Sequence, residues 1–140
     1  MFLLDTNVIS ELRKNKPHGS VVAWRHSVPH HQLAIPAVVI GEIQEGVEIT
    51  RKQDAGKAVE IEIWLEQLMA YYPILPMDGE IFREWARLTA GKSGDLDGDA
   101  LIAAAARVHN LTVVTRNVRD FAGLGVKLLN PFANPSKEKI

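Results

Sequence analysis

Short, almost wholly apolar segments alternate with longer segments of helical periodicity along this chain, and this alternation restricts its fold more than any other feature. The apolar segments are residues 2–4, 32–35, 74–75, 112–114 and 127–129. Strands that are apolar on both faces are typical of a parallel sheet covered by helices on both sides. The alternation therefore predicts an α/β fold, a three-layer α/β/α sandwich with a mostly parallel central sheet.

Four segments between the apolar stretches have the spacing of amphipathic helices. In residues 37–52 apolar side chains recur every three or four positions, and Pro36 favours a helix start there. Residues 58–72 carry a longer apolar stripe, which predicts either core packing or an interface with another subunit or partner. Residues 80–92 and 99–110 have the same spacing. A further helix is expected directly after the first strand.

Length and composition bound the class of protein. With 140 residues and no internal repeat, the chain is predicted to form one domain over residues 1–133, followed by a solvated tail at 134–140. The net charge of −1 provides no global positive field for nucleic acid, so any phosphate contacts must be local. The absence of cysteine excludes disulfides and thiolate chemistry. Because the longest apolar segments are also too short to span a membrane, a soluble cytoplasmic protein is expected.

Three acidic residues stand where a predicted helix begins or packs on the sheet. Asp5 follows the first strand, where it is suited either to cap the next helix or, if Thr6 or Asn7 caps instead, to serve a site. Glu42 has apolar neighbours three and four positions back, which favour the buried edge of its helix over the alternative of a solvated face. Asp99 opens an alanine-rich helix that is expected to pack closely on the sheet, and the helix dipole is the alternative explanation of its position.

A fourth polar junction follows the strand at 112–114, where Thr115, Asn117 and Asp120 are all candidate helix caps. In open α/β sheets, sites form beyond the carboxyl ends of strands, near a switch in strand order, so we expect the four junctions to converge there. Several carboxylates in one place need a cation to remain ionised. Oxygen ligands without cysteine or paired histidines favour Mg²⁺, with Mn²⁺ as the alternative. Such an ion activates water and neutralises charge on a phosphodiester.

Other chemistries have weaker support. Residues 91–93 resemble part of a P-loop, but the first glycine of that motif would fall at Ala86, inside a predicted helix. The five histidines show no metal-ligand spacing, which argues against zinc hydrolysis. A Mg²⁺-dependent phosphatase with Asp5 as nucleophile is an alternative, although the second acid that such phosphatases need two residues later is replaced here by Asn7.

Four motifs occur in a fixed order along nearly the whole chain. They are "LLDTNVISEL" with Asp5, "GEI" with Glu42, "DALIAAAA" with Asp99, and "VVTRNVRDF" with Asn117 and Asp120. In this combination the chain resembles PIN-domain ribonucleases of the VapC toxin type. The resemblance implies a Mg²⁺- or Mn²⁺-dependent endoribonuclease, a hydrolase of RNA phosphodiester bonds that a cognate antitoxin holds inactive and that is usually a homodimer.

The resemblance also implies roles for the junction residues. The predicted catalytic residues, which are the predicted metal ligands as well, are Asp5, Glu42, Asp99 and Asn117. The predicted supporting residues are Thr6, Asn7, Thr115 and Asp120. Many family members have an aspartate at the position of Asn117, and an amide ligates a cation without adding negative charge. This difference leaves open a PIN-like module that binds RNA or protein without cleaving it.

Two arginines are predicted to bind substrate. Arg13 lies at the end of the first predicted helix, and Arg116 adjoins the last junction, so each is placed to provide a phosphate contact that an acidic site lacks. The alternatives are ordinary solvated surface charge and contact with the antitoxin.

Overall fold

The computed structural model describes residues 1–90 and 98–133. Within these residues one sheet is formed by the strands β1 (Phe2–Leu4), β2 (Leu33–Pro36), β3 (Ile74–Leu75), β4 (Thr112–Val114) and β5 (Lys127–Leu129). The strand order is β3-β2-β1-β4-β5, and each neighbouring pair is parallel. The predicted α/β fold is therefore confirmed, with a shift of one residue in the second strand.

Helices connect the strands and cover the sheet. They are α1 (Thr6–Arg13), α2 (Gly19–Ser27), α3 (Ala37–Arg51), α4 (Ala55–Tyr71), α5 (Gly79–Thr89), α6 (Gly98–His109) and α7 (Val118–Phe121), with a 3₁₀ turn η1 (His30–Gln32) before β2. Right-handed crossovers place the helices between β1 and β3 on one face and those between β3 and β5 on the other. Helix α1 packs against α2 and α3, and α6 packs against α5 and α7, while α3 and α6 also contact each other.

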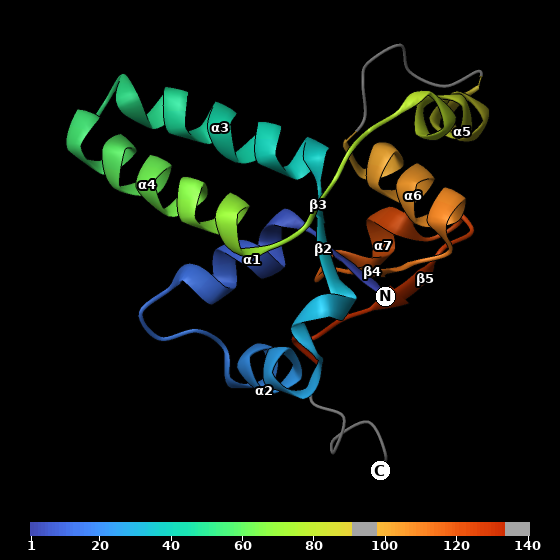
Figure 1. The fold of residues 1–140 in the computed structure, drawn as a ribbon, viewed down its shortest axis with the longest axis horizontal. Helices are drawn as coiled ribbons and strands as arrows, with labels where there is room; N and C mark the ends of the chain where they lie inside the picture. The colour runs from blue at the N-terminus through green and yellow to red at the C-terminus, as the bar shows by residue number, and fades with distance from the viewer. Residues whose placement is uncertain (91–97, 134–140) are drawn as a thin grey trace.

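Figure 1 shows α3 and α4 side by side as a long pair that extends away from the sheet, and the two helices are in contact along their length. Local signals explain where several helices start. Asp54 caps α4 by accepting a hydrogen bond from the backbone N–H of Lys57 at 3.0 Å, and Asp78 caps α5 through the N–H of Ile81 at 3.0 Å. The four helices predicted from periodicity are present, with bounds shifted by up to three residues, whereas α2 was not predicted.

The hydrophobic core forms where α6 and the other helices pack on the sheet. Every residue from Ala100 to Ala106 is buried, because the small side chains of this segment allow α6 to approach its neighbours closely. The apolar stripe predicted within residues 58–72 also belongs to the core. Leu65 and Leu68 are buried in the core. Ile61, Trp64 and Tyr72 are partly buried and pack against it. Core packing is therefore the observed role of that stripe.

The strand order reverses between β1 and β4, at the centre of the sheet. Backbone hydrogen bonds continue past the strand ends there: the N–H of Asp5 donates to the carbonyl of Val114 at 3.0 Å, and the N–H of Thr115 donates to the carbonyl of Leu129 at 3.0 Å. The carboxyl ends of β1, β4 and β5 are thus tied together at one edge. Ligands of open α/β sheets bind at such an edge.

Some predictions concern residues that the structure does not describe. The P-loop-like tripeptide at 91–93 and the predicted tail at 134–140 both lie outside the described residues. The division of the chain into a domain and a tail therefore stays a prediction. Within residues 1–90 and 98–133, no helix is both long and apolar enough to cross a membrane.

Candidate functional site

Asp5 is held at the carboxyl end of β1 by uncharged hydrogen-bond donors. Only 5% of the residue is exposed. Its Oδ1 accepts a hydrogen bond from the backbone N–H of Thr6 at 2.8 Å, so Asp5 caps α1. Its Oδ2 accepts from Asn7 Nδ2 at 3.1 Å and from Thr115 Oγ1 at 2.8 Å. These three donors stabilise the buried carboxylate, and no basic side chain within the described residues forms an ion pair with it.

Thr115 is the centre of this hydrogen-bond network. It is fully buried; its hydroxyl donates to Asp5, and the same oxygen accepts from Asn7 Nδ2 at 3.2 Å and from the backbone N–H of Asn117 at 3.0 Å. The amide of Asn7 is bound at both ends, because its Oδ1 accepts from the backbone N–H of Arg116 at 3.0 Å. Asn7 and Thr115, both predicted as supporting residues, therefore lie in direct contact with the predicted catalytic Asp5.

Glu42 reaches the same edge from α3. Its Oε2 accepts a hydrogen bond from Thr6 Oγ1 at 3.2 Å, and the backbone N–H of Thr6 donates to Asp5. Thr6 thus connects Asp5 and Glu42. Although the apolar neighbours of Glu42 favoured a buried position, the residue is exposed, because its carboxylate extends beyond the apolar face of α3 to the wall of a pocket.

That pocket has a volume of about 510 Å³ and lies between α3 and the start of α6. It is lined by Val38, Gly41, Glu42, Glu45, Gly98, Asp99 and Leu101. A methyl group added at Gly98 would come within 2.7 Å of Glu42 Oε1, so glycine at this position permits the close approach of the carboxylate to α6. Asp99 follows directly, half-buried in the first turn of α6. The pocket therefore brings Glu42 and Asp99 together from distant parts of the chain.

The donor chemistry of this pocket fits a hard divalent cation, but the described acids do not form a three-residue centre. Glu42, Glu45 and Asp99 offer oxygen ligands. Within residues 1–90 and 98–133, no group of three or more histidine, aspartate or glutamate side chains is arranged to hold a metal ion. Mg²⁺ commonly keeps several waters and takes one or two protein carboxylates together with substrate phosphates. Glu42 and Asp99 provide two such carboxylates. Asp5 is connected to Glu42 through Thr6, which donates a hydrogen bond to each of them.

The other two predicted residues of the fourth junction, Asn117 and Asp120, are exposed at the start of α7. Asn117 is exposed at the start of α7, and its side chain makes no capping hydrogen bond. Asp120 is exposed in the first turn of the same helix. The roles of both residues as ligand and support stay predictions.

The two arginines predicted to bind substrate lie in different places. Arg116 is exposed, and its backbone is bound to Asn7 beside Asp5. Arg13 is the last residue of α1, about 10 Å of helix from the first, and its guanidinium carbon lies 5.5 Å from the ring centre of Trp64 on α4. The structure therefore brings Arg116 to the acidic edge, and it places Arg13 at the other end of α1.

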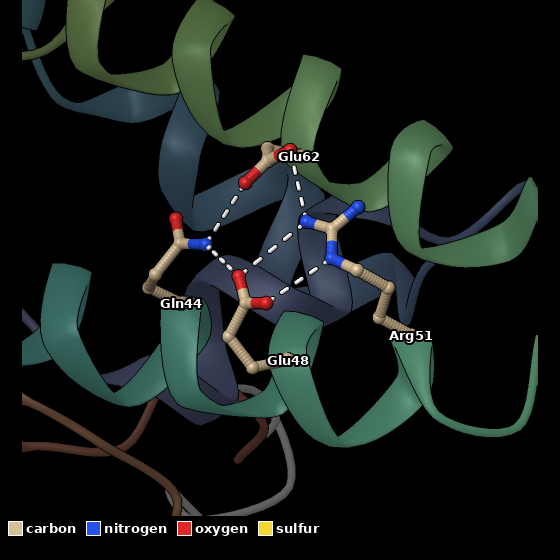
Figure 2. A network of polar contacts seen from close by, with 4 residues as sticks. All are labelled: Gln44, Glu48, Arg51 and Glu62. Atoms are coloured by element: carbon tan, nitrogen blue, oxygen red, sulfur yellow. Dashed lines mark hydrogen bonds and ion pairs between the residues drawn. The ribbon is translucent and has the colours of Figure 1, made fainter. Parts of the chain in front are cut away.

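A second group of acids lies farther along α3 and is paired with an arginine side chain. Figure 2 shows Gln44, Glu48 and Arg51 of α3 together with Glu62 of α4. Arg51 contacts Glu48 at 3.1 Å and Glu62 at 3.0 Å, and Gln44 Nε2 donates to both carboxylates, at 2.7 and 2.9 Å. Hydrogen bonds from Arg51 and Gln44 hold the pKa of Glu48 and of Glu62 below the usual value. This group joins α3 to α4.

The fold and the acidic edge define a class of protein. A parallel α/β sheet that gathers carboxylates and hydroxyls near its switch point is suited to bind a cation and a phosphate group. The chain belongs to the PIN domain family, whose profile matches residues 2–126. The resemblance carried by the four sequence motifs is thereby confirmed.

Relatives cover almost the whole chain. It is 33% identical over 139 residues to Toxin FitB of Neisseria gonorrhoeae, with 94% of this chain and 99% of that protein covered. It is 33% identical over 137 residues to VapC ribonuclease Y4jK of Sinorhizobium fredii, with 94% and 98% covered. The crystal structure of FitAcB from Neisseria gonorrhoeae contains a chain that matches with a TM-score of 0.81 at 33% identity, covering 96% of this chain and all of that one (100%). These similarities confirm the VapC-type assignment.

Two residues beside the site were not predicted. Gly98 controls how closely Glu42 approaches α6, and a glycine directly before Asp99 at a helix start was a signal in the sequence. Phe132 lies under Arg116, with 4.5 Å between its ring centre and the guanidinium carbon. Nothing in the sequence near Phe132 indicates this contact, because it depends on how β4 and β5 pair.

Proposed function

We propose that this chain is a divalent-ion-dependent endoribonuclease, a hydrolase of RNA phosphodiester bonds, and the toxin of a toxin–antitoxin pair. The proposed ion is Mg²⁺, with Mn²⁺ as the alternative. Membership of the PIN domain family supports the proposal, as does the similarity over nearly the full length to proteins named as a toxin and as a ribonuclease.

The observation that carries the proposal is the meeting of acids from three distant segments near the switch point. Asp5 follows β1, Glu42 lies on α3 and Asp99 opens α6. Thr6 connects the first two acids by hydrogen bonds, and one pocket contains the second and third. Helix capping explains the position of Asp5, but it does not explain why Glu42 is held beside both Thr6 and Gly98.

The acids would act together with the ion. A divalent ion bound in the pocket would supply charge neutralisation on the phosphodiester and an activated water. Glu42 and Asp99 are the proposed direct ligands. Asp5 contributes a fixed negative charge beside them, and Asn117 is the proposed uncharged ligand at the fourth position.

The polar neighbours of the acids orient them. Thr6 donates to Glu42, while Asn7 and Thr115 donate to Asp5 and so fix the direction of its Oδ2. Pre-organised groups of this kind lower the reorganisation that accompanies a reaction. Arg116, bound through its backbone to Asn7, is the proposed partner of an RNA phosphate.

The proposal is tested by incubating the purified chain with single-stranded RNA in Mg²⁺, in Mn²⁺ and in excess EDTA, and by separating the products on a denaturing gel. Cleavage is expected with either ion, none is expected with EDTA, and Asp99→Asn is expected to abolish it. Cleavage that persists in EDTA would contradict the proposal. Binding of RNA without cleavage would identify the non-cleaving module, and hydrolysis of a small phosphomonoester alone would identify the phosphatase.

A cognate antitoxin protein and a homodimer are part of the same proposal. Apolar side chains that remain exposed on α4 and α5 support further protein contacts; they include Val59, Ile63, Met69 and Phe82. Expression of the chain alone is expected to stop growth, and co-expression of a small reading frame adjoining its gene is expected to restore growth. Light scattering after size-exclusion chromatography is expected to give twice the mass of the chain.

A further inference from the structure

We propose that Phe132 is a positioning residue that orders the guanidinium of Arg116, whose backbone is bound at the acidic edge, for contact with an RNA phosphate. The inference rests on the proposed function and extends it to a residue outside the acidic motifs. It is carried by three sets of contacts: those that fix Arg116, those that fix the backbone of Phe132, and the contact of His18 with the Phe132 ring.

Arg116 is fixed at its backbone and over its side chain. Its N–H donates to Asn7 Oδ1 at 3.0 Å, and the other end of the Asn7 amide donates to Asp5 Oδ2. Its guanidinium carbon lies 4.5 Å from the ring centre of Phe132, within the range of a cation–π interaction. Arg116 is exposed, and within the described residues it forms no ion pair. Its hydrogen-bond donors therefore remain available to a ligand.

Phe132 is brought to Arg116 by the pairing of β4 with β5. The N–H of Thr115 donates to the carbonyl of Leu129 at 3.0 Å, so the residues that follow the two strands leave the sheet side by side. Asn130 then turns the chain, because its Oδ1 accepts from the N–H of Phe132 at 3.0 Å and its carbonyl accepts from the N–H of Ala133 at 3.2 Å. The turn directs the ring towards Arg116.

His18 braces the ring from the connection between α1 and α2. The two rings meet edge to face, with 5.5 Å between their centres and an angle of 62°. The backbone N–H of His18 donates to Glu11 Oε2 at 2.9 Å, and Glu11 is a buried residue of α1 whose pKa is lowered by its hydrogen bonds to Lys14 and to His18. The ring of Phe132 therefore contacts both His18 and Arg116.

This arrangement suits a phosphate of a single-stranded RNA more than a structural role. Arg107 pairs with a carboxylate, that of Glu84, at 2.6 Å, so its charge is already neutralised. Arg116 instead lies over an uncharged ring, which limits its side-chain freedom and keeps its positive charge unneutralised. Pre-ordering a long side chain reduces the entropy lost when it binds a ligand.

The inference is tested by measuring the dissociation constant of a single-stranded RNA oligonucleotide in EDTA, and KM and kcat in Mg²⁺. Phe132→Leu is expected to raise the dissociation constant and KM by about two- to fivefold, the strength of an exposed cation–π contact, with kcat nearly unchanged. Phe132→Tyr keeps an aromatic face and is expected to restore the wild-type values. Arg116→Ala is expected to weaken binding more and to lower the salt dependence of the binding constant by about one phosphate contact.

Matched variants separate positioning from damage to the fold. Arg119, which is exposed on α7, lies three residues beyond Arg116, and Arg119→Ala is expected to have a smaller effect on binding. Because Phe132 acts through Arg116, Phe132→Leu is expected to add nothing in the Arg116→Ala background. The inference is overturned if Phe132→Leu binds RNA like the wild type, if its effect adds fully to that of Arg116→Ala, or if the wild type does not bind RNA. If the wild type binds RNA without cleaving it, the nuclease proposal is refuted. The dissociation constants of the variants relative to the wild type still decide the inference about Phe132.

Discussion

Two acidic regions of this protein share the helix α3 and differ in what surrounds their carboxylates. At one end of the helix, Glu42 joins the edge where Asp5 is stabilised by uncharged donors. Farther along, Glu48 shares Arg51 with Glu62 of the neighbouring helix. The carboxylate of Asp5 has no basic partner within the described residues and keeps its charge beside an added cation, whereas Glu48 and Glu62 already pair with one arginine. The first region is therefore suited to bind an ion, and the second to join two helices.

The largest loss of cleavage activity is expected when a single acid of the edge loses its charge. Asp5→Asn should lower kcat/KM for RNA cleavage at least about 100-fold, because a fixed charge of the site is removed. It should also lower the free energy of unfolding by about 1–3 kcal/mol, since in either orientation the new NH₂ group faces a donor, from Thr6 on one side or Asn7 on the other. Cleavage kinetics and urea unfolding measure the two effects, and a variant that cleaves RNA at the wild-type rate would contradict the assignment.

A smaller effect on activity is expected from one methyl group at the start of α6. Gly98→Ala should displace Glu42, whose Oε1 would lie 2.7 Å from the new Cβ, and should lower kcat/KM by about tenfold. Gly79→Ala is the matched control, because Gly79 is likewise the first residue of a helix and a methyl group added there would meet nothing within 4 Å. The control should keep full activity. Equal activities of the two variants would show that the position of Glu42 is unimportant.

The hydroxyl of Thr115 offers a way to weaken the edge without changing its charge. Thr115→Val keeps the shape of a fully buried side chain but removes the donor to Asp5 and the acceptor for Asn7. The free energy of unfolding should fall by about 1–3 kcal/mol, and activity should fall less than in Asp5→Asn because all the acids remain. Thermal unfolding and cleavage assays on the same sample test both expectations, and unchanged stability would contradict the role of this network.

The smallest effects are expected in the α3–α4 group. Glu62→Gln should leave RNA cleavage unchanged and lower the melting temperature slightly at neutral pH. The pKa of Glu62 is lowered from 4.5 by hydrogen bonds from Gln44 and Arg51, so its stabilising contribution is present above pH 4.5 and is lost as the pH falls through the lower folded-state value. The difference in melting temperature between wild type and variant should therefore shrink in acid. A melting-temperature difference that grows as the pH falls would contradict a lowered pKa of Glu62 in the folded state.

The fold could be predicted well from the sequence because its signals are local and strong. Uniformly apolar strands and regular helical spacing need no tertiary information, and Asp54 and Asp78 mark helix starts in the usual way. Helix α2 was missed because its cap is the ring of His18, which accepts from the N–H of Ser20, and because Val21 is its one fully buried residue. A weakly amphipathic helix with an unusual cap gives little periodic signal.

The members of the site could be predicted better than their contacts. The motifs identify Asp5, Glu42 and Asp99, but no sequence pattern indicates that Thr6 connects the first two acids or that Thr115 donates to Asp5 across 110 positions of the chain. The hydrogen bond from Thr6 depends on the packing of α1 against α3, and that from Thr115 depends on the pairing of β1 with β4. A cation is the explanation that the sequence suggests for a buried Asp5, and the structure shows three hydrogen-bond donors that account for its burial as well.

The most direct test compares two glutamates of one helix in the same assay. RNA cleavage in Mg²⁺ is measured for Glu42→Gln and Glu48→Gln, with EDTA as the blank for each. If the edge of the sheet is the catalytic region, Glu42→Gln loses at least about 100-fold in rate and Glu48→Gln stays within about twofold of the wild type. Equal rates for the two variants, or a larger loss in Glu48→Gln, would contradict the assignment of the site.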